Sequence, residues 1–152
     1  MPLKDNLLIN MGESYIVTNL CSPDPEIVQE YAVNGLLGDT PETQSQAPPK
    51  LKLRVFSVSR SDQPDLFSCQ FEEQEVVIGR SPNCDIRVDD ELLSKMQASI
   101  SFDLNSREWV LQDGYQGKKS TNGTWLYLNE EIPIQSGMLF KSNQTFFQAT
   151  VE

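Results

Sequence analysis

The sequence predicts an all-β fold for residues 51–152, an antiparallel β-sandwich of about ten to eleven strands. Three observations lead to this prediction. Apolar and polar residues alternate in short runs, as they do on strands with one buried face. Turn-forming residues separate these runs at short intervals. The segment is also about 100 residues long, which is enough to bury a core of its own.

The predicted strands follow one another along the chain with an alternating pattern, except for a short continuous apolar run that ends at Gly79. In the first one, Leu51, Leu53 and Val55 alternate with Lys52 and Arg54. The apolar positions of the later strands are Val76, Val77 and Ile78; Ala98, Ile100, Phe102 and Leu104; Trp109 and Leu111; and Phe147, Ala149 and Val151. The turn signals between them are Ser81-Pro82-Asn83, Asn105-Ser106, Asp113-Gly114, Asn122-Gly123, Asn129-Glu130 and Ser136-Gly137.

Residues 1–50 are predicted to be an acidic, largely disordered tail and linker. Residues 39–50 contain Pro, Ser, Thr and Gln and no large apolar residue, so ordering them would gain little burial. A short helix over 25–34 is the alternative to disorder in part of the tail. Asp24 is a suitable N-cap for it, and Pro25 suits the first helical position.

Composition argues against several classes of function. The chain contains no histidine, which removes the commonest general base. Its three cysteines, Cys21, Cys69 and Cys84, are widely spaced and do not make a zinc motif. No phosphate-binding glycine loop or catalytic Ser-His pair is present. We therefore expect no enzymatic activity, no cofactor and no metal.

Charge and hydropathy limit the partners and the compartment. The formal net charge is −10, which disfavours direct nucleic-acid binding. No run approaches the roughly 20 apolar residues of a membrane span, and no signal peptide is evident. The odd number of cysteines is typical of reduced thiols. We expect a protein inside the cell, cytoplasmic or nuclear, neither secreted nor transmembrane, with no membrane partner.

Three segments at strand ends carry the residues of chemical interest. They read Val77-Ile78-Gly79-Arg80-Ser81, Leu93-Ser94-Lys95-Met96-Gln97-Ala98 and Ser120-Thr121-Asn122-Gly123-Thr124-Trp125. A Gly-Arg pair alone is a weak signal, and Asn-Gly alone indicates only a turn. All three in this order, on a strand-rich segment, resemble the forkhead-associated (FHA) domain, and the likeness covers residues 51–152.

The resemblance implies an FHA/SMAD-like sandwich that binds phosphothreonine-containing segments of partner proteins. By that likeness, Arg80 reaches the phosphate, Ser94 donates its hydroxyl to a phosphate oxygen, and Lys95 lies beside it. Thr121 contacts the phosphate or the threonine methyl group. Asn122 holds the main chain of the ligand. These side chains are chemically suited to the ligand. A phosphothreonine is a dianion with three strong acceptors, so it is bound well by cations and neutral hydrogen-bond donors.

The resemblance also gives supporting residues and two departures from the family pattern. Gly79 and Gly123 are expected to permit tight backbone geometry, and Lys118 and Lys119 are possible auxiliary cations. The family usually has Arg or Asn where this chain has Lys95, and His where it has Gln97. Lys95 keeps the charge without the bidentate fork. Gln97 keeps one donor and one acceptor and can brace the loops in place of His.

Simpler interpretations remain open for these residues. Arg80 can be a surface arginine at a strand end, Ser94 a turn residue, and Asn122 with Gly123 an ordinary hairpin turn. Lys118 and Lys119 can lie on a solvated loop, while Trp109 and Trp125 are expected in the core. The alternative function is a structural subunit of a larger complex that docks through the sandwich and the N-terminal segment, with weak or lost phosphopeptide binding.

Overall fold

The computed structural model describes residues 1–22, 48–58, 62–70, 75–143 and 145–152. These residues form eleven strands, so the all-β prediction is confirmed. The strands are β1 (Leu8–Met11), β2 (Ser14–Cys21), β3 (Lys50–Phe56), β4 (Asp65–Cys69), β5 (Val76–Gly79), β6 (Ile86–Arg87), β7 (Ala98–Asp103), β8 (Glu108–Asp113), β9 (Trp125–Leu126), β10 (Leu139–Ser142) and β11 (Thr145–Gln148).

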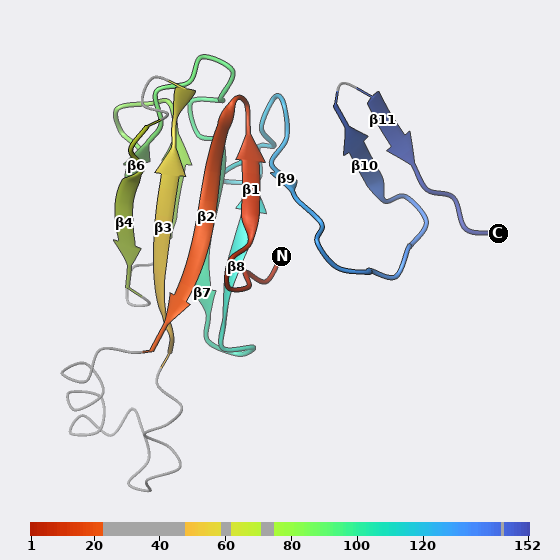
Figure 1. Cartoon of the computed structure of the whole chain (residues 1–152), viewed down its shortest axis with the longest axis horizontal. Coiled ribbons are helices and arrows are strands. Elements are labelled where there is room, and N and C mark those ends of the chain that lie inside the picture. Colours follow the sequence, from red (N-terminus) through yellow and green to blue (C-terminus); the bar gives the residue numbers. More distant parts are fainter. Residues whose placement is uncertain (23–47, 59–61, 71–74, 144) are drawn as a thin grey trace, which may run out of the picture.

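Two sheets form the sandwich that Figure 1 shows. One has the strand order β4-β3-β2-β1-β9 and the other the order β6-β5-β7-β8. Neighbouring strands are antiparallel except for β5 and β6, which pair in parallel with Ile78 opposite Ile86. The sandwich is therefore antiparallel, as predicted, apart from this one short pair.

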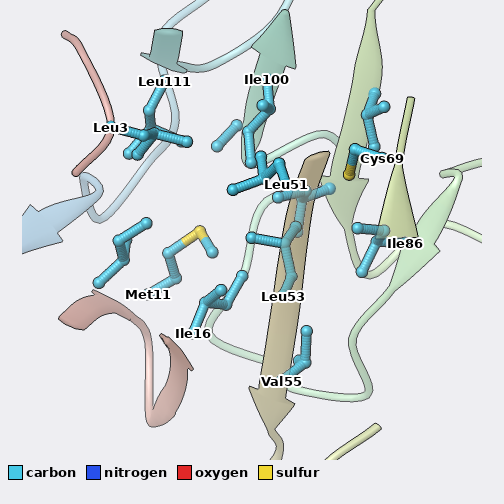
Figure 2. Close-up of a cluster of buried hydrophobic side chains, with 14 of the residues drawn as sticks. Leu3, Met11, Ile16, Leu51, Leu53, Val55, Cys69, Ile86, Ile100 and Leu111 are labelled. Atoms are coloured by element: carbon cyan, nitrogen blue, oxygen red, sulfur yellow. The ribbon is translucent and has the colours of Figure 1, made fainter. Parts of the chain in front are cut away.

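The core lies between the two sheets, where apolar side chains from both meet (Figure 2). Leu51 and Leu53 of β3 and Ile100 of β7 are almost completely buried. Trp109 of β8 is 1% exposed, as the sequence suggested, and it contacts the ring of Phe102 edge-on at 5.4 Å between centroids. Its ring nitrogen donates a hydrogen bond to a backbone carbonyl, which satisfies the one polar atom of this large side chain.

The N-terminal residues are part of the sandwich, and the prediction of a disordered tail was wrong for them. Strands β1 and β2 form a hairpin, and β2 pairs with β3 along seven residues. Met11 and Ile16 point into the core beside Leu51 and Leu53 (Figure 2). Gly12, with φ at 60°, permits the tight turn between the two strands. Residues 1–22 are therefore built into the sheet in this structure.

The first three residues also join the second sheet. The amino group of Met1 donates to the carbonyl of Leu111 at 2.8 Å, and the N–H of Leu3 donates to the carbonyl of Trp109 at 2.7 Å. The N-terminal segment therefore contributes to both sheets. The possible helix over 25–34 and most of the expected linker lie outside the described residues.

The last two strands form a separate hairpin. β10 pairs with β11 alone, and Figure 1 shows this hairpin beyond β9, apart from the two sheets. It touches the sandwich where the ring of Phe146 meets that of Trp125, at 5.4 Å between centroids. Within the described part of the chain, no helix has the length and apolar content needed to cross a membrane.

Candidate functional site

Arg80 stands at the end of β5, where the backbone comes very close to the second motif. Gly79 is buried, and a Cβ atom placed on it would lie 2.3 Å from the carbonyl oxygen of Lys95, so only glycine fits there. The Nε of Arg80 donates to the carbonyl of Leu93 at 2.7 Å. This bond fixes one side of the guanidinium while the side chain remains exposed, which leaves its outer edge available to an anion.

Ser94 and Thr121 join the second motif to the third. The N–H of Thr121 donates to the Ser94 hydroxyl at 2.9 Å, and that hydroxyl donates to the Thr121 hydroxyl at 3.2 Å. The amide of Asn122 donates to the carbonyl of Leu92 at 2.8 Å. The segment 92–95 is therefore the meeting point of all three motifs, which lie far apart in the sequence.

Gln97 lies beneath these contacts and is completely buried. Its carbonyl oxygen accepts a hydrogen bond from the N–H of Ser94 at 2.9 Å. Its amide nitrogen donates to the carbonyl of Gly123 at 2.9 Å and to the hydroxyl of Thr124 at 3.3 Å. Gln97 thus uses both ends of its amide to brace two loops against each other, which is the role the sequence suggested for it.

The lysines of the region are all exposed. Lys95 follows Ser94 directly, and Lys118 and Lys119 lie on the turn that precedes Ser120. Backbone bonds between Tyr115 and Lys118 close this turn. None of these lysines, nor Arg80, forms an ion pair with another described residue. These cations lie on or beside the joined loops of a protein whose net charge is −10, and the same segments also carry the carboxylates Asp89, Asp90, Glu91 and Asp113.

Sequence reasoning missed Asp90, which is 6% exposed and holds the second motif to the N-terminal hairpin. One carboxylate oxygen accepts from the N–H of Glu13 at 2.9 Å and from the hydroxyl of Ser14 at 2.8 Å. The other accepts from the N–H of Leu92 at 2.9 Å. An Asp whose carboxylate bonds a backbone N–H two residues later is a recognisable turn signal, but its link to Ser14 depends on the fold.

Asp113 was recognised only as part of a turn, and it organises the third motif. One carboxylate oxygen accepts hydrogen bonds from the hydroxyls of Ser120 and Thr124, at 2.5 and 2.9 Å. The Ser120 hydroxyl in turn accepts from the N–H of Gly123 at 3.0 Å. Gly123 has φ at 77°, a value that favours glycine. These bonds fix the loop that presents Thr121 and Asn122.

Cys84 supports the same region from inside. Its thiol donates to the carbonyl of Lys95 at 3.1 Å, and burial raises the pKa of this thiol above its usual value. It therefore behaves as a small apolar residue with a weak donor and not as a nucleophile. Among the described residues, no group of three His, Cys, Asp or Glu side chains is placed to hold a metal ion.

Comparison with known proteins adds one match. The family model of the FHA domain matches residues 76–141, which include β5 to β9, most of β10 and all three motifs. No curated protein and no solved structure matches the chain. FHA domains are interaction modules that bind phosphothreonine. Residues 76–141 therefore match the FHA domain family, and the three joined loops lie within this segment.

Proposed function

We propose that this domain is an adaptor that binds phosphothreonine-containing segments of partner proteins through Arg80, Ser94, Lys95, Thr121 and Asn122. One observation carries the proposal. The three motifs meet at residues 92–95, where hydrogen bonds from Arg80, Thr121 and Asn122 converge. A dianion placed there would face cations and hydroxyl donors at the same time.

Each side chain has a role that its chemistry suits. The outer edge of the Arg80 guanidinium and the Lys95 ammonium supply charge-assisted hydrogen bonds to the phosphate. The Ser94 and Thr121 hydroxyls rotate to donate to phosphate oxygens. Asn122 uses one amide hydrogen on Leu92, which leaves its other hydrogen and its carbonyl oxygen for the main chain of the ligand.

The strength of such a site suits reversible association. A hydrogen bond to a charged group contributes about 1.5–3 kcal/mol net, so two or three of them correspond to roughly micromolar binding. If the threonine methyl group is buried against the loops, it adds about 0.8 kcal/mol. We therefore expect phosphothreonine to be preferred over phosphoserine by about fourfold.

Matched peptides test the proposal. The full chain is titrated by calorimetry with peptides from a degenerate library, each in phosphothreonine, phosphoserine and unphosphorylated form. We expect Arg80→Ala to weaken phosphothreonine binding by roughly ten- to a hundredfold, since it removes a charge-assisted bond. Arg54→Ala is the control, because Arg54 is an exposed arginine on β3. Equal affinities of the two variants, or equal binding of unphosphorylated peptide, would contradict the proposal.

A further inference from the structure

The outer face of the sheet that contains β3 carries a row of cations. Every second side chain of β3 points into the core, and Lys50, Lys52 and Arg54 lie between them on the opposite face. We call these three residues the basic stripe. Side chains two positions apart on a strand are spaced about 7 Å from each other. None of the three forms an ion pair with another described residue, so their positive charges repel one another without a nearby carboxylate to offset them.

The strands on either side of β3, which lie next to it in Figure 1, add no charge to this row. The residues paired with the basic stripe are all uncharged: Val17, Asn19 and Cys21 on β2, and Leu66 and Ser68 on β4. Leu66 lies directly opposite Arg54 and is 74% exposed. At the margin of the face, the carboxylate of Asp5 already accepts from the N–H of Leu20. The face therefore combines positive charge with exposed apolar surface.

The most acidic connection of the chain begins and ends beside the basic stripe. Residues 23–47 belong to the connection between β2 and β3 and lie outside the described residues. They contain five carboxylates and no lysine or arginine, a formal charge of −5 in a chain of −10. β2 ends at Cys21, which pairs with Lys50 at the start of β3. A segment tethered in this way is held at roughly millimolar effective concentration near its anchors.

Residues 24–31 are the part of this connection that suits the face best. They read Asp-Pro-Glu-Ile-Val-Gln-Glu-Tyr, so three carboxylates are interspersed with apolar side chains. Residues 39–47 have two carboxylates and no large apolar residue. Glu30 follows Cys21 by nine residues, which span at most about 30 Å when extended. The basic stripe is about 14 Å long, so the carboxylates can reach all of its cations.

We propose that the basic stripe is the docking site for residues 24–31 of the same chain. Glu26 and Glu30 pair with Lys52 and Arg54, and the apolar side chains between the two carboxylates cover Leu66. Docking offsets the repulsion among the cations and holds much of the acidic connection on the sheet. It concerns the outer face of a sheet and not the joined loops at the strand ends, so it does not depend on phosphopeptide binding.

Limited proteolysis of the full chain by chymotrypsin tests the docking, because this protease cleaves after Tyr31 only when the segment is accessible. We expect K52E/R54E to raise the cleavage rate at Tyr31 by about three- to tenfold. Two exposed ion pairs are lost, and cleavage follows the population of the open form. E26K/E30K should have the same effect, and the variant that combines all four changes should return to nearly the original rate.

K118E/K119E is the matched control, because it reverses two exposed lysines on a different surface and should leave the rate unchanged. A K52E/R54E rate equal to that of this control would overturn the proposal. Faster cleavage that the four-residue exchange failed to reverse would overturn it as well, because the carboxylates would then not meet these cations.

Carbodiimide coupling of the unmodified chain provides a second measurement that does not depend on the stability of a variant. The reagent condenses a carboxylate with a neighbouring amine to an amide, with loss of water. We expect an intramolecular amide between Lys52 and Glu26 or Glu30, mapped by peptide mass spectrometry, and none between Lys118 and these carboxylates. Absence of the Lys52 amide would contradict the docking. Covalent dimers linked through Lys52 would also contradict it, because a second copy would then occupy the face.

Discussion

At the scale of single residues, Gln97 is the side chain on which the site geometry depends most directly. It is buried, and its amide joins Ser94 to Gly123 and Thr124. Gln97→Met keeps the approximate volume but leaves these buried partners unsatisfied, at a cost of about 1–3 kcal/mol for each group stranded. We expect a fall of this order in the free energy of unfolding, measured by urea denaturation of the full chain, and weaker phosphopeptide binding.

Gln112→Met is the control for this prediction, since Gln112 is an exposed glutamine on β8. Gln97→His provides a second comparison. Imidazole also offers one donor and one acceptor, so this variant should retain more affinity than Gln97→Met. If Gln97→Met matched the control in both stability and affinity, the bracing role of Gln97 would be wrong.

At the scale of elements, Asp90 couples the β1–β2 hairpin to the loop that carries Ser94. Its carboxylate accepts from the turn of that hairpin and from Leu92. Asp90→Ala removes the acceptor for all three donors, so we expect a loss of stability of several kcal/mol. The variant should also bind phosphopeptide more weakly at a temperature where it is still folded. Urea denaturation and calorimetry measure the two effects.

Asp89→Ala is the matched control for this coupling, because Asp89 is the exposed neighbour with the same charge. It should leave stability and affinity nearly unchanged. Ser14→Ala should fall between the two variants, since it removes one of the three donors and leaves the others. Unchanged affinity in folded Asp90→Ala would show that the hairpin stabilises the sandwich without holding the site.

At the scale of the whole molecule, the proposed site presents the cations Arg80 and Lys95 on an acidic protein with a net charge of −10. The long-range field repels anions, and salt screens this field beyond about 10 Å. We therefore expect added salt to act oppositely on two phosphothreonine peptides. The association rate of one with acidic flanks should rise between about 20 and about 200 mM NaCl, and that of one with lysine flanks should fall.

Stopped-flow fluorescence with labelled peptides measures both rates. The unphosphorylated lysine-flanked peptide is the control for attraction that does not involve the phosphate. If added salt lowered the association rates of both phosphopeptides equally, attraction by the local cations would dominate the approach of the peptides to the site. The net charge of the protein would then have no part in steering the peptides.

Much of this architecture could be predicted from local pattern. Alternation along residues such as Leu51, Leu53 and Val55 indicates strands, because side chains on a strand point to opposite faces in turn. The three motifs identified Arg80, Ser94 and Asn122 as candidates. The order and spacing of the motifs can be read along the chain without knowing which segments lie together in the fold. Gly79 and Gly123 were also singled out, and both stand where backbone geometry favours glycine.

Other features depend on contacts between residues far apart in the chain. The carboxylate of Asp90 bonds Ser14, and the ring nitrogen of Trp109 bonds Pro49. Sequence alone could not place residues 1–22 in the sheet, because a short hairpin such as β1–β2 becomes stable only when it is paired with β3.

The amino-acid sequence by itself determined the fold class, the three loops and the types of residue they present. The tertiary structure alone decided that the N-terminal hairpin fills the edge of β3, and that Asp90 and Gln97 hold the loops together. The reason is that strand alternation and turn chemistry are local properties of the chain. Strand partners and buried hydrogen bonds are chosen only when distant segments pack together, as β2 with β3 and Asp90 with Ser14 illustrate.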